Sequence, residues 1–412
     1  MENPKIRFKG FTKDWEQRKL NEVAEKICVG FVGTCEKFYT DESGIPMYRT
    51  GNLNGLSLNR DDLKYVTNEF HQHNQKSQLK AGDILIARHG DSGKAVNYEN
   101  SEEANCLNIV IIRPDFKKRN YKFLTNCINS PECQKHIKSL SAGSTQAVIN
   151  TSEIEKLGVV IPANIDEQNR IARYFSTLDN LITLHQRKCE QTKKLKKYML
   201  QKMFPRNGAK VPEIRFDGFT YDWEQRKLGD MGSTFTGLSG KTKEDFGHGD
   251  AQFITYMNVF SNPVANLEMT EAVEIDAKQN RVKKGDVFFT TSSETPEEVG
   301  MSCVMPENKD NIYLNSFCFG YRPTEKFDLD YLAYVLRADS FRKEMKFLAQ
   351  GISRYNISKN KVMEVSIPIP NLEEQTMVGR YFSTLDHLIT LHQRKCDELK
   401  KMKKYMLQNM FI

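Results

Sequence analysis

The longest regular pattern in the chain is a helical spacing of apolar residues between Glu167 and Phe204. Apolar side chains recur there every three or four positions, which is the spacing of a coiled-coil seam. The same spacing returns near the end of the chain, so we predict two long helices. The seam positions are Ile171, Phe175, Leu178, Ile182, His185, Cys189, Thr192, Leu195 and Met199 in the first helix, and Val378, Phe382, Leu385, Ile389, His392, Cys396, Leu399, Met402 and Met406 in the second.

Each predicted helix needs a partner for its seam. A helix of this extent is about 57 Å long, because each residue adds about 1.5 Å along the axis. Alone it would leave the whole seam in water. The nearest candidate for a partner is the other copy. Because each helix follows an equivalent region, we predict that the two pack antiparallel about a pseudo-twofold axis and separate two domains.

Before each helix the apolar residues follow shorter patterns, typical of strands that end at turn residues. Residues 81–96 form an apolar strand that leads into a polar loop, Leu107–Pro114 is an apolar strand that ends at proline, and Tyr121–Leu140 has helical spacing. The same three elements return, in the same order, as Lys283–Gly300, Leu314–Pro323 and Phe327–Leu348. We therefore predict an α+β fold with two homologous mixed α/β domains.

The sequence itself is duplicated. Tyr174–Glu190 recurs as Tyr381–Asp397, and Ile6–Leu20 recurs as Ile214–Leu228, with only two substitutions in each pair. The regions between these segments diverge. We predict a first domain at residues 1–160, a first helix at 161–205, a second domain at 206–368 and a second helix at 369–412. Trp15 and Leu20 lie among charged residues, so we predict that 6–20 is a docking segment outside the core.

Composition narrows the class of protein. The net charge of +7 and the pI near 8.7 favour a polyanionic partner without requiring one. The nine cysteines form no Cys-x-x-Cys pair, which is typical of reduced thiols in a cytoplasmic protein. No apolar segment follows Met1 and no window reaches the length of a membrane-spanning helix, so we expect neither a signal peptide nor a membrane span.

The sequence contains no recognisable catalytic set. Gly237–Thr242 resembles the end of a phosphate-binding loop, but Phe235 stands where that motif requires glycine. We predict no catalytic residue, no bound metal and no cofactor in this chain.

The repeated His185/Cys189 and His392/Cys396 pairs leave one alternative open. The two residues of each pair lie one helical turn apart. If the two helices cross at this point, the four side chains could assemble a Cys₂His₂ zinc site. Polar seam positions that fix the helix register are the favoured interpretation, because structural zinc sites usually have ligands at tighter spacing.

Polar side chains suited to DNA follow equivalent strands in the two predicted domains. Arg, Asn and Gln can read base edges with two hydrogen bonds, whereas Lys, Ser and Thr suit phosphates. Any one of these residues is also an ordinary surface group, so the prediction rests on the set. The candidate DNA-binding residues are Arg49, Asn52, Arg88, His89, Asp91, Ser92, Lys94 and Gln146 in the first domain, and Tyr256, Asn258, Thr291, Ser292, Ser293, Glu294, Arg354 and Tyr355 in the second.

The duplicated layout and three pairs of motifs resemble the specificity subunit of Type I restriction–modification systems, over essentially the whole chain. The first pair is the GSTQ-x-x-I and GISRYNI loops. The second is the Ile-Pro…Glu-Gln entry into each helix, at Ile161–Gln168 and Ile369–Gln375. The third is the Gly-Asp start of a strand at Gly82 and Gly285.

The resemblance implies two target recognition domains, each of which reads one half of an interrupted site in double-stranded DNA. It implies that the helices separate these domains and dock two methyltransferase subunits, to which restriction/translocase subunits attach. Adenine methylation and cleavage, the methyl donor, ATP and Mg would then belong to those partners, in defence against foreign DNA. Two alternatives are a self-contained nuclease–methyltransferase and a non-catalytic coiled-coil scaffold or DNA-binding adaptor without methyltransferase partners.

Overall fold

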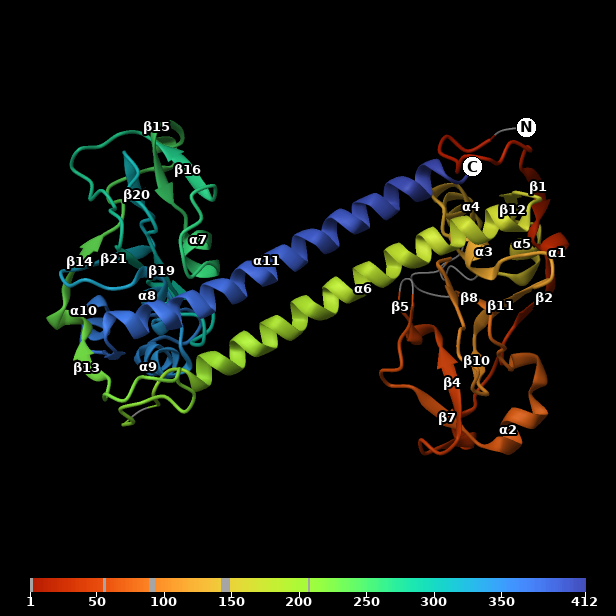
Figure 1. The fold of residues 1–412 in the computed structure, drawn as a ribbon, viewed down its shortest axis with the longest axis horizontal. Helices are drawn as coiled ribbons and strands as arrows, with labels where there is room; N and C mark the ends of the chain where they lie inside the picture. Colours follow the sequence, from red (N-terminus) through yellow and green to blue (C-terminus); the bar gives the residue numbers. More distant parts are fainter. Residues whose placement is uncertain (1–2, 55–56, 89–92, 142–148, 207) are drawn as a thin grey trace. The chain divides into compact units, whose positions relative to one another are not determined.

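The computed structural model of the chain describes residues 3–54, 57–88, 93–141, 149–206 and 208–412. They belong to two compact units: unit 1 is Met1–His185 with Arg394–Ile412, and unit 2 is Gln186–Gln393. Two 38-residue helices, α6 (Ile165–Lys202) and α11 (Leu372–Asn409), each contribute to both units (Figure 1). The predicted α+β class with two homologous domains is confirmed. The four predicted segment boundaries stay a prediction.

Unit 1 contains two four-stranded sheets. One has the antiparallel order β2-β11-β8-β9, and the other has the order β10-β4-β7-β3, in which β10 runs parallel to β4. Strand β1 pairs antiparallel with β12, and β5 pairs with β6. The strands are β1 Glu16–Lys19, β2 Ala24–Val29, β3 Tyr39–Thr40, β4 Ile45–Arg49, β5 Leu53–Asn54, β6 Ser57–Leu58, β7 Lys64–Val66, β8 Ile84–Ala87, β9 Ala95–Asn97, β10 Asn105–Leu107, β11 Ile109–Pro114 and β12 Gly158–Ile161. The short helices are α1 Leu20–Val23, η1 Glu36–Phe38, η2 Thr50–Asn52, α2 Asn68–His73, η3 Gln75–Ser77, α3 Tyr121–Ile128, α4 Pro131–Ser141 and α5 Thr151–Lys156.

Unit 2 repeats this plan with different lengths. Its sheet β14-β21-β17-β19 corresponds to β2-β11-β8-β9, its parallel pair β15/β20 corresponds to β4/β10, and β13/β23 corresponds to β1/β12. The strands are β13 Glu224–Lys227, β14 Gly232–Thr236, β15 Phe246–Ile254, β16 Thr270–Val273, β17 Val287–Thr290, β18 Ser292–Ser293, β19 Ser302–Val304, β20 Ile312–Leu314, β21 Cys318–Pro323, β22 Tyr355–Asn356 and β23 Ser366–Ile369. The helices are η4 Leu228–Asp230, η5 Lys243–Asp245, α7 Tyr256–Ser261, α8 Leu329–Val335, α9 Asp339–Leu348 and α10 Lys359–Met363.

The central strands are apolar throughout because both of their faces are covered. Alternate residues of a strand point to opposite faces. In β8, Ile84 and Ile86 belong to the core that contains α3 and α6, whereas Leu85 belongs to the core under the second sheet. In β17, Phe288 and Phe289 divide in the same way. A continuous apolar run is therefore what this position in the fold requires.

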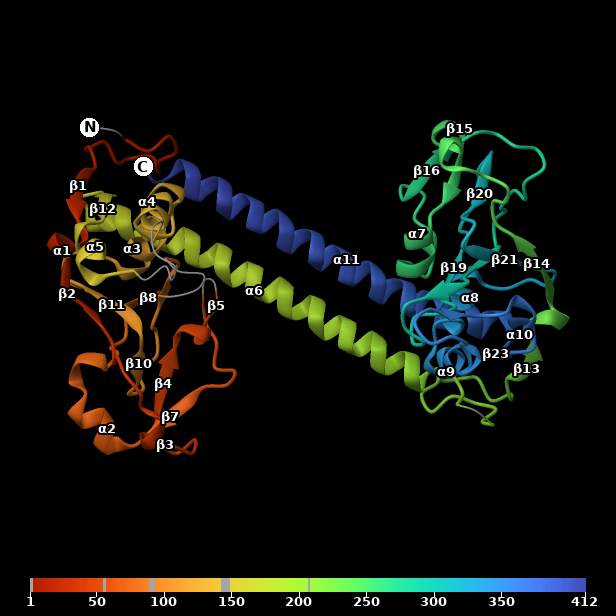
Figure 2. The same cartoon turned by 180° about the vertical axis from the view of Figure 1, so that it is seen from behind.

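The N-terminal repeat is part of the core, which corrects the prediction that it is a docking segment. Trp15 is 1% exposed and Leu20 is fully buried. The Ile6 N–H donates to the Asn409 carbonyl at 2.9 Å, so the end of α11 lies against this segment of unit 1, as Figures 1 and 2 show from opposite sides. In unit 2 the Ile214 N–H makes the equivalent bond to the Lys202 carbonyl, at 3.0 Å. In each unit, the C-terminal end of one long helix is thus hydrogen-bonded to the N-terminal repeat segment.

The predicted helix Tyr121–Leu140 is two helices. It breaks between α3 and α4 at Asn129 and Ser130, just before Pro131. Proline lacks an N–H and disfavours a helical residue before it, so the helix cannot run through this point. In unit 2 the predicted helix Phe327–Leu348 is also two helices, α8 and α9, although the break there contains no proline.

Buried Arg–Glu–Trp triads explain why both copies keep the same N-terminal and Glu-Gln motifs. In unit 1, Arg7 donates to both carboxylate oxygens of Glu167, at 2.6 and 2.8 Å, and Trp15 Nε1 donates to the same carboxylate at 3.2 Å. In unit 2 the corresponding residues are Arg215, Glu374 and Trp223, with distances of 2.7, 2.9 and 3.0 Å. The repeated residues therefore form one hydrogen-bonded triad in each unit, which fixes the N-terminal segment to the start of the long helix.

The Gly-Asp motifs have a structural role as well. The buried carboxylate of Asp83 accepts two hydrogen bonds from Arg113 on β11, both of 2.7 Å. Asp286 accepts two from Arg322 on β21, at 2.7 and 2.6 Å. The two pairs hold β8 and β17 to their neighbours.

Inside each unit, a piece of α6 runs antiparallel to a piece of α11. In unit 2, Lys196 pairs with Asp386 at 2.6 Å, and in unit 1 Lys403 pairs with Asp179 at 2.6 Å. Burial lowers the pKa of Lys196, and the Asp386 carboxylate opposes this shift. Lys196 and Lys403 thus contact the other helix, whereas their sequence neighbours Leu195 and Met402 were predicted to do so. Leu195 and Met402 are 41% and 49% exposed and therefore lie outside the seam. Among the described residues, no helix has the length and apolar character needed to span a bilayer.

Candidate nucleic-acid interface

Three segments of unit 2 surround a hollow of about 660 Å³. They are α7, the strand β18 with the loop that follows it, and the loop before β22. The hollow contains five of the residues predicted to bind DNA, although they come from segments far apart in the sequence. The lining residues are Tyr256, Met257, Phe260, Ser292, Ser293, Glu294, Glu298, Ser353 and Arg354.

Backbone hydrogen bonds fix the loop that carries Arg354. Its two ends are joined by reciprocal bonds between Gln350 and Asn356, at 2.9 and 2.8 Å. Strand β22 pairs with β18, and the Ile357 N–H donates to the Thr291 carbonyl at 3.0 Å. Gly351 has φ +150° and a Cβ there would lie 2.0 Å from the Arg354 carbonyl oxygen, so the turn requires glycine. The exposed Arg354 is therefore presented beside Ser292 and Ser293 by a braced loop.

Tyr256 forms part of the floor of the hollow. Its hydroxyl donates to the Ser292 carbonyl at 2.7 Å, and its ring stacks on that of Phe260 with centroids 6.1 Å apart. Burial raises the pKa of the Tyr256 hydroxyl, so it remains a neutral donor at physiological pH. This residue joins α7 to β18.

The rim of the hollow has mixed charge. The side chains of Glu294, Glu298 and Arg354 are exposed, and the Glu298 carboxylate accepts from Ser293 Oγ at 3.2 Å and from Thr295 Oγ1 at 3.0 Å. Carboxylates repel phosphate but accept from the amino group of cytosine, while Arg pairs with guanine. Chemically, this set suits base edges better than the DNA backbone.

Unit 1 joins the equivalent segments by the same backbone bond. The Ile149 N–H donates to the Arg88 carbonyl at 3.2 Å, and Arg88 Nε donates to the Ile149 carbonyl at 3.1 Å. Lys94 is exposed. Arg49 donates to the carboxylate and the carbonyl of Asp62, both at 2.8 Å. The predicted residues His89, Asp91, Ser92 and Gln146 lie outside the described residues.

The two predicted asparagines do not face the surface, which is a correction. Asn52 is 2% exposed and Asn258 is fully buried. Asn52 accepts from the Arg49 N–H and donates to the Asp61 carbonyl, at 2.8 and 3.2 Å. Asn258 donates to the carbonyls of Asn266 and Met269, at 2.7 and 2.9 Å. Both amides hold the loop that follows them, so in this arrangement neither reaches a base.

Two further predicted residues lie beside the hollow rather than in it. Thr291 Oγ1 donates to the Phe317 carbonyl at 2.8 Å, which uses its hydroxyl within the unit. Tyr355 is half-buried on β22 and pairs with Ser293.

Sequence reasoning missed Met257, Phe260, Glu298 and Ser353, which also line the hollow. Helical spacing carries a usable signal for two of them. Residues 256, 257 and 260 share one face of α7, whereas Asn258 and Val259 lie on the other face and are buried.

The predicted seam residues divide between the two units. Phe175, Leu178, Ile182, Cys189, Phe382, Leu385 and Cys396 are buried, while His185, Ile389 and His392 are half-buried. In unit 2, Cys189 Sγ lies 3.8 Å from the Ile389 carbonyl oxygen, a contact between helix pieces. Within the described part of the chain, no three His, Cys, Asp or Glu side chains are grouped to hold a metal. Metal analysis of the purified protein remains the test of the zinc alternative.

Unit 1 has a larger hollow, of about 820 Å³, between β1, α4 and the end of the chain. Its lining includes Arg18, Glu132, Cys133 and Lys156. None of the residues predicted to bind DNA is among the residues that line it.

Comparison with protein families identifies the repeated unit. The family described as Type I restriction modification DNA specificity domain matches residues 12–194 and again residues 221–401. The "Putative type I restriction enzyme MjaX specificity subunit" of Methanocaldococcus jannaschii is 25% identical over 423 residues, which cover 96% of this chain and 92% of that protein. The MjaVIII specificity subunit of the same organism is 25% identical and covers 66% of each chain.

Solved structures share the fold. The Type-I restriction-modification S subunit from M. genitalium aligns with a TM-score of 0.64 at 15% identity, over 100% of this chain and 99% of that chain. A chain from work on complex assembly and conformational transition of the type I R-M system aligns with a TM-score of 0.53 at 16% identity, over 96% and 97%. At these identities the similarity supports the fold alone.

Proposed function

This chain belongs to the family of Type I restriction modification DNA specificity domains, and we propose that each of its two units reads one half of an interrupted site in double-stranded DNA. Membership of this family gives the chain the role of recognising a DNA sequence in a Type I restriction–modification system. Two units with one skeleton and different loops suit two different half-sequences. A site of this kind is asymmetric, because the two readers differ.

The hollow of unit 2 is the observation that carries the proposal. It collects Arg354, Glu294 and Glu298 on one braced surface, and such side chains discriminate between base pairs in the major groove. In unit 1 the described residues at the two ends of the equivalent loop are Arg88, which is half-buried, and Lys94, which is exposed. Different donors and acceptors on the same backbone frame favour different bases.

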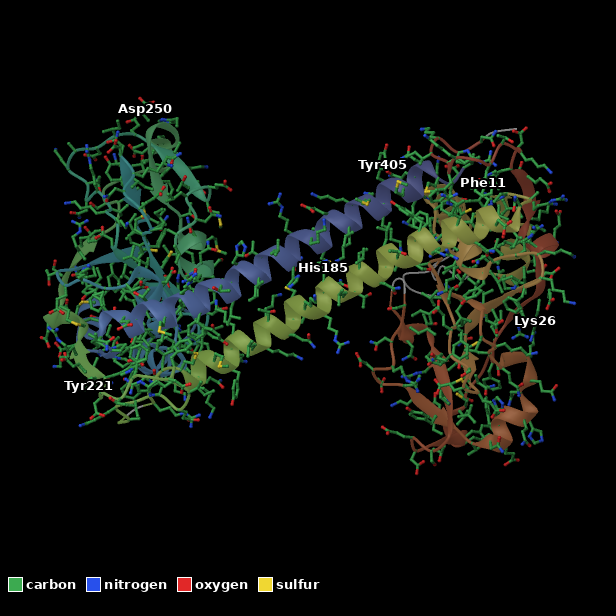
Figure 3. All side chains as sticks on the ribbon, in the orientation of Figure 1. Phe11, Lys26, His185, Tyr221, Asp250 and Tyr405 are labelled. Atoms are coloured by element: carbon green, nitrogen blue, oxygen red, sulfur yellow. The ribbon has the colours of Figure 1, made fainter. Side chains whose placement is uncertain are left out.

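We propose that the long helices bind two methyltransferase subunits. Each unit has three exposed apolar side chains at equivalent positions on its helix pieces: Leu184, Met402 and Tyr405 in unit 1, and Leu391, Leu195 and Tyr198 in unit 2. Figure 3 labels Tyr405 on α11. Exposed apolar residues at matched positions are typical of interfaces, and two equal sets suit two copies of one partner.

Restriction/translocase subunits would attach to that assembly. In this proposal the chain itself catalyses nothing; adenine methylation and DNA cleavage, with methyl donor, ATP and Mg, belong to the partners. The proposed location is the cytoplasm, where the partners and the DNA meet.

The decisive experiment has two parts. Methylated adenines are mapped across the genome of the source cell, and the purified assembly is then tested on oligonucleotides that carry the mapped site. We expect a bipartite sequence with a fixed gap and binding that weakens as salt rises. Methylation by this chain alone would refute the non-catalytic role, and the absence of sequence preference would refute the reading function.

Charged substitutions in the apolar sets should release the partners one at a time. We expect Tyr405→Asp to remove one methyltransferase copy, Tyr198→Asp to remove the other, and the double variant to remove both, because a carboxylate buried against apolar surface is costly. Native mass spectrometry reports the stoichiometry. Lys197→Asp, next to Tyr198 but a quarter turn away around α6, should keep both copies. Retention of both copies by the double variant would place the interface elsewhere.

Shortening both helices should change the gap between the half-sites and leave the half-sequences unchanged. Deletion of His185–Lys188 together with His392–Lys395 removes equivalent residues. Each helix then loses about 6 Å, at a rise of about 1.5 Å for each residue. At about 3.4 Å per base pair we expect a gap shorter by one or two base pairs. Mapping of methylated sites measures this directly. Replacement of the same residues by alanine keeps the length and should keep the gap, whereas altered half-sequences would contradict the proposed division of roles.

A further inference from the structure

In both units, a side chain binds the glycine at the end of the loop that follows a central strand. The side chain comes from α4 and the loop follows β8 in unit 1, and the side chain comes from α9 and the loop follows β17 in unit 2. Gln134 of α4 donates from Nε2 to the Gly93 carbonyl at 2.6 Å. Arg342 of α9 donates from Nη1 to the Gly300 carbonyl at 2.7 Å. The two donors and the two glycines occupy equivalent positions in the repeat. An amide in one unit thus performs the contact that a guanidinium performs in the other.

Each glycine is also fixed by its own conformation. Gly93 has φ +99° and Gly300 has φ +65°, which favours glycine. A Cβ would lie 2.6 Å from Ile137 Cγ2 in the first case and 3.2 Å from Met345 Sδ in the second, and these two residues are again equivalent. The glycines are therefore seated directly on α4 and α9.

A second pair of equivalent residues anchors the strand that follows. Asn129 donates to the Ala95 carbonyl at 2.8 Å, and Arg337 donates to the Ser302 carbonyl at 2.8 Å. Two anchors therefore recur in both units with different side chains. Because the two regions otherwise diverge in sequence, this recurrence indicates that the loop end must be held in one place.

The loop of unit 2 is longer and Arg342 holds more of it. Five residues separate β8 from Gly93, whereas nine separate β17 from Gly300. Arg342 Nη2 donates to the carbonyls of Glu297 and Val299, at 2.8 and 2.7 Å. The bonded carbonyls therefore lie on both sides of Glu298. Lys346 forms a further ion pair with the Glu297 side chain.

We infer that Arg342 is a positioning residue for base reading in unit 2, because it fixes the backbone on both sides of Glu298 and so directs that carboxylate into the hollow. Gln134 occupies the corresponding position in unit 1. This inference rests on the proposed function. Arg342 itself bonds to backbone carbonyls in the loop, so it acts through Glu298 rather than by contact with DNA.

Loss of Arg342 should affect discrimination more than folding. Of the carbonyls that it binds, that of Glu297 belongs to an exposed residue, where water can replace the lost donor, whereas Val299 and Gly300 are buried. The apolar packing of α9 should remain, because Phe341 and Met345 supply it. A loop with more freedom holds Glu298 less often in the position that distinguishes one base pair from another.

The test compares variants of the full chain in its assembly with the methyltransferase subunits. For each variant, binding to the mapped site is divided by binding to sites with one base changed in the half read by unit 2. We expect Arg342→Ala to lower this ratio by about tenfold at one or two positions, within the usual effect of one mismatch. The ratio for the other half-site should stay at the wild-type value.

Three further single substitutions and one double variant make the test specific. Arg342→Gln should recover part of the ratio, since an amide at this position reaches the glycine carbonyl in unit 1. Lys343→Ala, the next residue on α9, should leave the ratio unchanged. Glu298→Ala should lose discrimination at the same bases as Arg342→Ala, and the double variant should be no worse than Glu298→Ala alone.

An unchanged ratio in Arg342→Ala would overturn the inference while leaving the proposed function intact. Equal losses at both half-sites, or additive losses in the double variant, would overturn it too. If the wild-type assembly has no sequence preference, the proposed function fails and the inference fails with it.

Discussion

Replacement of residues 21–150 with the corresponding region of another family member is expected to change one half-site and keep the other. Affinity for the old half-site should fall about 10³-fold or more, the usual minimum gap between specific and non-specific binding. The reason is that this segment holds the equivalent loops of unit 1, whereas unit 2 is built from Gln186–Gln393. Mapping of methylated adenines gives the new site.

The boundaries of this exchange suit the fold of unit 1. The Leu20 N–H donates to the Leu157 carbonyl at 3.0 Å, and Gln168 accepts from the Asn120 N–H at 3.0 Å. The first bond joins two residues outside the exchanged segment and is kept, and the second needs only a backbone N–H from the insert. The reciprocal exchange of residues 229–358 should change the other half-site. New sequences at both halves in either chimaera would contradict the assignment of one half-site to each unit.

Much of the fold could be predicted from periodicity and repetition. The first long helix has the predicted length and begins at Ile165, two residues before the predicted start. The strands with continuous apolar runs are central strands. Trp15 was assigned incorrectly because its neighbours are charged, and local charge does not reveal that Arg7 pairs with Glu167, 160 positions away. Long-range pairs of this kind are invisible to a window of sequence.

The candidate site was predicted less well than the fold, for a related reason. The sequence indicates which loops follow strands, but it does not indicate which side chains within them turn inward. Asn258 has the chemistry of a base reader, yet on α7 it faces the core, where its amide closes a loop. Glu298 lies in a stretch of ordinary acidic residues, and its bonds with Ser293 and Thr295 and the bonds from Arg342 to its neighbours distinguish it. Position in the fold decides function here more than residue type.

Loss of Arg215, the cation of the unit 2 triad, should lower the free energy of unfolding more than any other single substitution proposed for this chain. Arg215→Ala leaves the Glu374 carboxylate, 1% exposed, with the Trp223 N–H but without its charged partner. Breaking a buried pair in this way costs about 3–5 kcal/mol, because an uncompensated charge stays in the interior. The chain has two tryptophans, one in each triad. In a Trp15→Phe background, the fluorescence of Trp223 during urea unfolding therefore reports unit 2.

A surface pair supplies the control for this prediction. Arg226 binds Glu325 with two bonds of 2.6 and 2.7 Å, but their side chains are 35% and 40% exposed. Arg226→Ala should therefore cost less than about 1 kcal/mol. Arg215→Met combined with Glu374→Leu should recover much of the loss, because it removes both charges together. Equal losses for Arg215→Ala and Arg226→Ala would mean that burial of the pair does not determine its contribution. The repeated Arg, Trp and Glu-Gln motifs would then need another explanation.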